Sequence, residues 1–308
     1  MTILARWRPT RWTAGVARLA IVVALLAGCG EAPGTPAAST SAPTASVAGP
    51  SPTAQACRPV EAPAVTNGWR ERTFYEIFVR SFADADGDGI GDIAGLTAKL
   101  DYLNDGDAGT TDDLGVTGIW LMPVAEASSY HGYDVTDYEA VESDYGTTDG
   151  LRGFVDAAHQ RGIAVIVDFV PNHTSSEHPW FRDALRGGDH REWYVWSDED
   201  PGWPPVAGPN PWHAAPNGSP FYYGAFSDRM PDLNLANPEV TAELERIAAF
   251  WLVEVGVDGF RIDAAKHLVE EGPAAQTNTA ASHRWLEAFR EAIAAIKPEA
   301  WWSVRCST

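Results

Sequence analysis

The chain has 308 residues, 45% of them hydrophobic, which is typical of a globular protein with one large domain or two ordinary ones. It carries 42 acidic and 22 basic residues, a formal net charge of −20. This balance argues against nucleic acid as a partner, because no basic stripe is available to neutralise phosphates. The acidic excess suits a soluble, cation-binding surface and by itself indicates no substrate.

Residues 1–28 are predicted to be a signal peptide. Four arginines precede an apolar run from Leu19 to Ala27, which is the layout of a secretory leader. The run ends in LAGC, which resembles the lipobox of bacterial lipoproteins, where the cysteine is lipidated and becomes the first mature residue. We therefore expect Cys29 to anchor an extracytoplasmic protein to the membrane of a bacterial cell. An ordinary cleaved leader with a chance cysteine is the alternative.

Residues 29–68 are predicted to be a disordered linker behind this lipid anchor. From Glu31 to Ala56 the chain is almost entirely Ala, Pro, Ser, Thr and Gly, a composition that cannot bury a core. Cys57 and Cys306 are the other cysteines. An extracytoplasmic location permits a disulfide, but their separation of 249 residues does not predict one.

Beyond about Trp69, strand-like and helix-like segments alternate. The short apolar segments are residues 74–79, 117–122, 163–170, 257–262 and 300–304. Near-continuous apolar runs of this length favour parallel strands that are covered on both sides.

Helical patterns lie between these segments. One set of apolar residues at helical spacing is Leu151, Phe154, Val155 and Ala158. Gly162 closes that helix, while Asn237 and Pro238 form an N-cap and first turn for another helix that runs to Gly256. Alternating strands and helices favour an α/β fold, either a barrel or a doubly wound sheet. No GxGxxG follows a strand, which weakens the nucleotide-binding version.

One connection is unusually long. Residues 172–236, between the third strand and its helix, are 65 residues rich in Pro, Gly and aromatic side chains. Connections of this length are normally functional or form a small subdomain. Aromatic rings can stack on sugars, but we expect most of these rings to form the core of an inserted subdomain.

The stretch DADGDGIGD has the spacing of a calcium loop. Its carboxylates come from Asp84, Asp86, Asp88 and Asp92. Ile90 would contribute its backbone carbonyl. Gly95 stands where a bidentate glutamate is expected, and a strand precedes the loop in place of a helix. We therefore predict a calcium loop without an EF-hand, with a plain acidic surface turn as the alternative.

The stretch GFRIDAAKH places two charges in an apolar strand. Residues two apart in a strand point to the same side, so Arg261 and Asp263 share one face while Phe260 and Ile262 share the other. Buried charges are costly unless they are paired. Taken alone, the motif indicates a structural ion pair.

Together these motifs resemble those of the α-amylase family, glycoside hydrolase family 13, across nearly all of residues 69–304. DFVPNH (168–173) is similar to the family's first conserved region, GFRIDAAKH to its second and MPDLN (230–234) to its fifth. HGYDVTDY (131–138) and the acidic loop resemble the branch between oligo-1,6-glucosidases and neopullulanases, which also holds certain α-amylases. The resemblance implies a (β/α)8 TIM barrel whose long third loop forms a small extra domain.

The resemblance also implies roles for individual residues. Asp263 matches the catalytic nucleophile and Arg261 the arginine that accompanies it. A cation beside Asp263 favours the ionised carboxylate that a nucleophile requires. The end of a barrel strand is also where barrel enzymes place their chemistry.

Further matches concern the substrate, which would be an α-glucan, and calcium. Tyr133 matches the aromatic ring that stacks on the cleaved sugar. His173 and His267 match ligands of sugar hydroxyls, with Lys266 further along the cleft. Ligands of a second calcium, which pins the insertion to the barrel, are matched by Asn172, Asp232 and the His267 carbonyl.

The end of the chain departs from the family. A retaining glycosidase needs a second carboxyl group about 5–5.5 Å from the nucleophile, and the family's acid is a glutamate after the fifth strand. Here residues 305–308 follow instead, and only about five of eight strands are present. We expect an incomplete copy, from a frameshift or a gene-model error, that is inactive alone.

Two classes of function therefore stay open. One is a monomeric α-amylase-type enzyme that cleaves α-1,4 bonds in starch or maltodextrins, with an oligo-1,6-glucosidase or neopullulanase-like enzyme as its variant. The other is a non-catalytic surface glycan binder or an unstable fragment.

Overall fold

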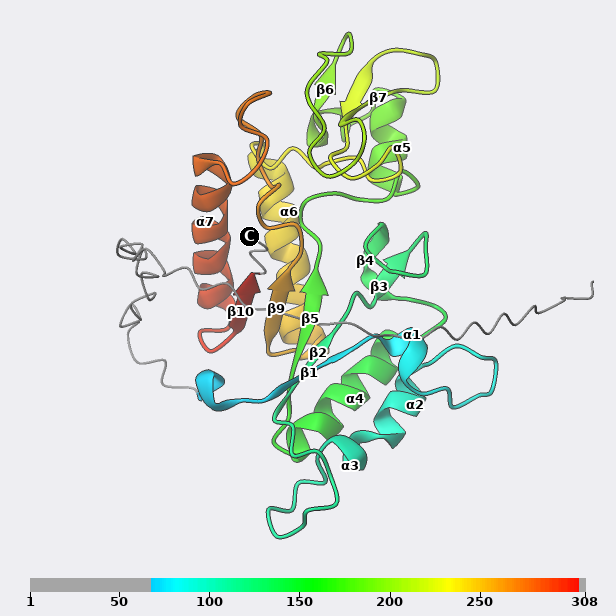
Figure 1. Ribbon diagram of the computed structural model, residues 1–308, viewed down its shortest axis with the longest axis vertical. Helices are drawn as coiled ribbons and strands as arrows, with labels where there is room; N and C mark the ends of the chain where they lie inside the picture. Colours follow the sequence, from blue (N-terminus) through cyan, green and yellow to red (C-terminus); the bar gives the residue numbers. More distant parts are fainter. Residues whose placement is uncertain (1–67, 305–308) are drawn as a thin grey trace, which may run out of the picture. The chain divides into compact units, whose positions relative to one another are not determined.

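A computed structural model describes residues 68–304 (Figure 1). The predicted signal peptide and almost all of the predicted linker lie outside the described residues, as do residues 305–308. The three cysteines are in these parts of the chain. Among residues 68–304, no helix is long and apolar enough to cross a membrane.

Five parallel strands form the main sheet. They are β1 (Phe74–Ile77), β2 (Gly118–Leu121), β5 (Ala164–Phe169), β9 (Gly259–Ile262) and β10 (Trp301–Val304). They pair in the order in which they follow one another along the chain. The five predicted strands are thus confirmed. The prediction that the first continues to residue 79 is wrong, because helix α1 (Val79–Phe82) starts there with Val79 buried. A short apolar run does not distinguish a strand from a buried helical turn.

Helices connect the strands. Besides α1, they are α2 (Ile93–Ala98), α3 (Leu100–Leu103), α4 (Thr148–Gln160), α6 (Pro238–Ala249), a π-helical turn (Phe250–Val255) and α7 (Ala280–Ile296). A short 3₁₀ helix, η1 (Trp69–Glu71), precedes β1. As predicted, Pro238 opens α6 and the Asn237 side chain accepts a hydrogen bond from the Glu239 amide at 3.0 Å. The helical run ends at Gly256, whose φ of 89° closes it without strain.

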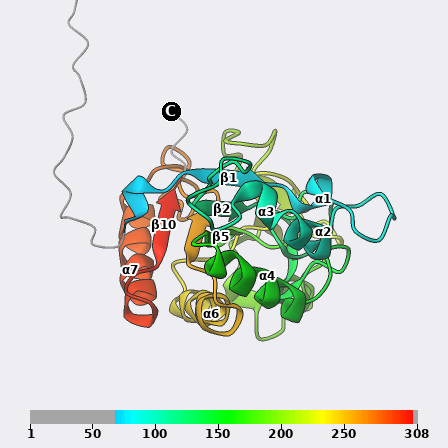
Figure 2. The same ribbon diagram turned by 90° about the horizontal axis from the view of Figure 1, so that it is seen from below.

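The helices cover only one face of the sheet, and the sheet is curled. Figure 2 shows α4, α6 and α7 around the outer side of the strands. Phe260 and Ile262 point into the core on that side. On the inner side, Phe74 of β1 and Trp301 of β10 approach to 5.9 Å between ring centroids although they belong to the two edge strands. This curvature is that of a barrel wall and excludes the doubly wound sheet that the sequence left open.

Two further structures extend from the ends of the barrel strands, a hairpin and the inserted subdomain. A hairpin of β3 (Ala125–Ala127) and β4 (Val135–Val141) follows β2, and the sequence did not indicate it. The predicted insertion contains α5 (Pro179–Leu185), η2 (Arg191–Trp193), β6 (Trp196–Ser197), β7 (Trp212–Ala214) and β8 (Phe221–Tyr223). Its strands form a separate antiparallel sheet. Trp203, Trp212 and Tyr223 pack edge to face within it, so these rings build the core of the insertion, as expected.

Candidate active site

Charged side chains gather where β5 and β9 end. Asp168 of β5 is the direct partner of Arg261 in β9. One nitrogen of Arg261, Nη1, donates hydrogen bonds of 2.6 Å to Oδ1 of Asp168 and to Oδ1 of Asp263. The Arg261 side chain is only 10% exposed. Its charge is tolerated there because two carboxylates share it.

Asp168 is a site residue that our sequence interpretation overlooked. Its side chain has no exposed surface. Its Oδ2 atom accepts hydrogen bonds from Trp120 Nε1 at 3.0 Å and from the Tyr133 hydroxyl at 3.4 Å. Burial raises the pKa of Asp168 to about 7, against the lowering effect of Arg261. The available signal was a single carboxylate inside a strand that is buried along its whole length.

The two carboxylates differ in what they can reach. Because Arg261 contacts both with one nitrogen, the carboxylates of Asp168 and Asp263 lie close together, as the two carboxyl groups of a retaining glycosidase do. Asp168 cannot protonate a substrate, because it is inaccessible and both its oxygens are engaged. The Asp263 side chain is 16% exposed and can make contact. The predicted position of the acid, residues 305–306, lies outside the described residues.

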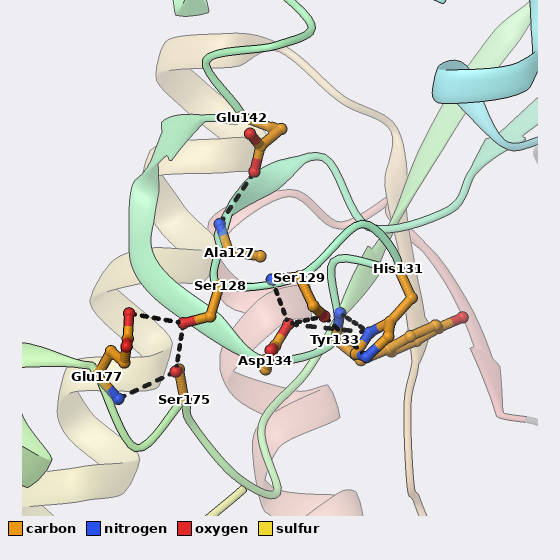
Figure 3. Close-up of polar contacts among 9 residues, drawn as sticks. All are labelled: Ala127, Ser128, Ser129, His131, Tyr133, Asp134, Glu142, Ser175 and Glu177. Atoms are coloured by element: carbon orange, nitrogen blue, oxygen red, sulfur yellow. Dashed lines mark hydrogen bonds and ion pairs between the residues drawn. The ribbon is translucent and has the colours of Figure 1, made fainter. Parts of the chain in front are cut away.

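Tyr133 lies in the turn between β3 and β4 (Figure 3). Its hydroxyl approaches Asp168, and burial raises the pKa of that hydroxyl. The preceding Gly132 has a φ of 78°, and a Cβ atom there would lie 2.8 Å from Cβ of Pro123. A larger residue would therefore displace the turn that carries Tyr133.

His173 and His267 come together through the insertion. Both are buried, and the Phe226 ring lies 5.2 Å from the imidazole of His173 and 5.1 Å from that of His267. Burial lowers the pKa of both histidines. The charge of Asp263 acts on both, and also on Tyr133. The structure thus places the two predicted sugar ligands within the electrostatic reach of Asp263, the predicted nucleophile.

A cleft extends this site along the insertion. It has a volume of about 550 Å³ and lies between residues 205–207 of the insertion and the loop after β9. Lys266 and His267 line it, together with residues 273, 274, 276 and 277. Lys266 thus lines a cleft next to His267, and its role in binding substrate stays a prediction.

The acidic loop brings three of its four predicted carboxylates together. Oxygens of Asp84, Asp86 and Asp88 lie within 4.8 Å of one another, and all three residues are exposed. Asp92 instead caps α2, accepting hydrogen bonds from the amides of Gly95 at 2.6 Å and Ala85 at 2.9 Å. Converging carboxylate oxygens are the donors that calcium prefers, so the three residues fit that ion.

Asn172 and Asp232 also fit a hard cation. The Asn172 amide donates a 3.0 Å hydrogen bond to Asp232, while its own Oδ1 atom is buried without a partner in the described part of the chain. Asp232 is 1% exposed, and no cationic side chain among residues 68–304 pairs with it. Burial raises the pKa of Asp232, and the charge of nearby Glu270 raises it further. Glu270 is a second carboxylate here that the sequence interpretation did not include.

Comparisons with known proteins agree with this geometry. The family model described as the α-amylase catalytic domain matches residues 76–302. Alpha-amylase 3 of Dictyoglomus thermophilum is 42% identical over 233 residues, which are 75% of this chain and 42% of that protein. The oligo-1,6-glucosidase of Parageobacillus thermoglucosidasius is 39% identical over 203 residues, 63% of this chain and 34% of that protein.

A solved structure gives the same result. The alpha-amylase from H. orenii superposes with a TM-score of 0.71 at 48% identity, covering 77% of this chain and 48% of that one. The chain thus spans less than half the length of these relatives. Its sequence motifs, its five consecutive barrel strands and the family match agree, and the chain belongs to the α-amylase family of glycosidases, glycoside hydrolase family 13.

Proposed function

We propose that this chain binds α-glucans and that Asp263 is the nucleophile of a retaining cleavage of α-1,4-glucosidic bonds. The observation that supports this proposal best is the ion pair at the end of β9. There the buried Arg261 holds the accessible carboxylate of Asp263 in one orientation. We choose α-1,4 over α-1,6 bonds because the two relatives named alpha-amylase are more similar in sequence to this chain. They are 42% and 48% identical to it, whereas the oligo-1,6-glucosidase is 39% identical.

The chemistry follows from this placement. The Asp263 carboxylate attacks the anomeric carbon while the bond to the leaving oxygen breaks, and that oxygen takes a proton from an acid. Water then releases the sugar from the covalent ester. The Tyr133 ring lies where it can stack on the reacting sugar. His173 Nε2 is buried without a partner in the described region and can hydrogen-bond a sugar hydroxyl.

Trapping the nucleophile tests this proposal without depending on the acid. The reagent is an α-maltotriosyl fluoride with a second fluorine at C5 of the reacting ring. Fluoride leaves without a proton, and the ring fluorine slows hydrolysis of the adduct. We expect intact-protein mass spectrometry to show one added maltotriosyl group, and peptide mapping to place it on Asp263.

The control is Asp263→Asn, which keeps the size of the side chain and should remain unlabelled. Maltoheptaose in excess should slow labelling of the parent protein by competition. A folded chain that gains no adduct, or that is labelled equally well after Asp263→Asn, would disprove the assignment of the nucleophile.

We also propose two structural calcium sites. Asp84, Asp86 and Asp88 would hold one ion at the rim of the barrel, and the spacing of the loop adds the Ile90 carbonyl. Asn172 and Asp232 would hold the other between the insertion and the barrel, with Glu270 and the His267 carbonyl from the barrel side. Calcium would supply positive charge that offsets the repulsion between these neighbouring carboxylates.

We also propose a lipid anchor at Cys29, with an extracytoplasmic location.

A further inference from the structure

The turn that carries Tyr133 contains a continuous chain of hydrogen bonds (Figure 3). The backbone N–H of Tyr133 donates to Nδ1 of His131 at 3.1 Å. On the other side of the imidazole, Nε2 lies 2.8 Å from the Ser129 hydroxyl. That hydroxyl in turn donates to Oδ1 of Asp134 at 2.7 Å. Two side chains, His131 and Ser129, therefore link the backbone of Tyr133 to the buried carboxylate of Asp134.

One direction of the protons satisfies every hydrogen bond in this chain. Nδ1 of His131 faces an N–H group, so it must carry a lone pair, and the ring proton must be on Nε2. Nε2–H then donates to Ser129, whose own proton is given to Asp134. Every donor meets an acceptor, and successive bonds of this kind strengthen one another.

The rest of the turn is held firmly, whereas His131 remains accessible. The Asp134 side chain is 6% exposed and that of His131 is 33% exposed. The Ser128 hydroxyl lies 2.6 Å from that of Ser175, in the segment that follows His173. His131 thus lies between a fixed anchor and the residue that projects toward Asp168 and Asp263.

We propose that His131 is a positioning residue that sets the backbone of Tyr133, and with it the sugar-stacking ring, through the acceptor at Nδ1. The inference rests on the proposed function for the role of Tyr133 as a sugar platform, but not for the hydrogen-bond chain itself. We assign His131 a positioning role and not a catalytic one, because the contact that carries the inference is with the Tyr133 backbone.

Three substitutions separate the two contacts of the imidazole. Asn places its Oδ1 atom at the same position along the side chain as Nδ1, so His131→Asn keeps an acceptor for the N–H two residues ahead. Gln reaches the position of Nε2, so His131→Gln keeps the contact with Ser129 but lacks the Nδ1 acceptor. His131→Ala loses both. His283→Ala removes an exposed histidine of α7 and is the matched control.

The first readout is the trapping reaction described above, measured against reagent concentration. We expect His131→Ala and His131→Gln to raise the half-saturating concentration about tenfold, with little change in the maximal rate of labelling. His131→Asn should stay within about twofold of the parent. Equal effects of Asn and Ala, or no effect of Ala, would overturn the proposal.

The second readout does not depend on labelling. In ¹⁵N-histidine spectra, His131 should show a proton on Nε2 only. The Tyr133 amide should exchange with solvent at least about tenfold faster after His131→Ala or His131→Gln, but not after His131→Asn. If the parent protein is not labelled, the proposed function fails and these spectra still decide the positioning role. An Nδ1–H tautomer, or unchanged exchange after His131→Ala, would refute it.

Discussion

The indole N–H of Trp69, just ahead of β1, donates a 2.9 Å hydrogen bond to the backbone carbonyl of Glu299, just ahead of β10. The Trp69 ring also lies 5.1 Å from Trp301 and 6.2 Å from Phe74, measured between ring centroids. These contacts join the two edge strands of the sheet across its inner face. Trp69 therefore helps to hold the barrel curvature that brings β5 and β9 around the site.

Replacing Trp69 should lower the free energy of unfolding in two separable steps. Trp69→Phe keeps an aromatic ring and loses the hydrogen bond, which should cost about 1 kcal/mol plus a smaller packing loss. Trp69→Ala should cost about 3–5 kcal/mol, because the side chain is 7% exposed and leaves a cavity. Urea unfolding measures both. The control is Tyr102→Ala, at a position that is 52% exposed, and it should hardly change the free energy of unfolding. Comparable losses of stability at Trp69 and Tyr102 would contradict the bridging role of Trp69.

Asp258 should make stability depend on pH. Burial alone would raise the pKa of Asp258. However, Asp258 accepts hydrogen bonds from His159 at 2.7 Å and from the Val165 amide at 2.8 Å. These bonds, together with the charges of His159 and Lys297, bring the pKa below the ordinary 3.8. The folded state then binds fewer protons than the unfolded state. The contribution of the Asp258 carboxylate to the free energy of unfolding is therefore present above pH 3.8. It is lost as the pH falls through the lower pKa that Asp258 has in the folded state.

We therefore expect Asp258→Asn to destabilise the protein by about 1–3 kcal/mol at pH 6, and the difference from the parent to shrink as pH falls toward 3. Urea unfolding at several pH values measures this trend. Asp112→Asn removes an exposed carboxylate and is the control. A difference that stays constant or grows on acidification would show that Asp258 does not stabilise the fold as a carboxylate.

The acidic loop should bind calcium with structural consequences. Saturating calcium, at about 100 times its dissociation constant, should stabilise the parent protein by about 2–3 kcal/mol per site. Asp88→Ala should lower the melting temperature in calcium but not in excess chelator. Asp112→Ala makes the same change of charge outside the loop. If calcium leaves the melting temperature of the parent unchanged, the loop is only an acidic turn.

Glu270 should have opposite effects with and without calcium. In chelator, Glu270→Gln should leave stability equal or higher, because it removes one of two neighbouring carboxylates whose charges oppose each other. In calcium it should lower stability, because the ion loses a ligand. Terbium luminescence in an Asp88→Ala background reports this site separately and should weaken.

Glu271→Gln is the matched control for that experiment, since Glu271 is the exposed neighbour of Glu270 and pairs with Arg284 at 3.7 Å. It should leave terbium binding unchanged. Terbium binding that survives both Glu270→Gln and Asp232→Asn would remove this calcium site from the proposal.

The lipid anchor is testable by fractionation. If Cys29 is lipidated, Cys29→Ser should move the mature protein from the membrane fraction to the soluble fraction of the expressing cells. The prediction rests on the lipobox-like LAGC that ends the apolar run. Cys57→Ser changes a cysteine beyond that motif and should have no effect. Unchanged partitioning after Cys29→Ser would exclude lipidation.

The local pattern of apolar residues and helix caps in the sequence was enough to predict most of the helices and strands. The five strands follow from apolar runs, and the start of α6 from Asn237 and Pro238, because both signals act over a few residues. The common face of Arg261 and Asp263 follows from the period of two in a strand. The spacing of Asp84, Asp86 and Asp88 also brought their oxygens together, since the ligands of such a loop are neighbours in the chain.

Tertiary structure decided what depends on distant segments. The same strands and helices could have formed a doubly wound sheet, and only the packing of α4, α6 and α7 on one face gives the curled barrel wall. Asp168 became the partner of Arg261 through strand register, across 93 residues of chain. The charge of Glu270 acts on Asp232 only because the insertion folds back on the loop after β9. Periodicity tells which face a side chain takes, but its partner is set by register and packing, which no single segment contains.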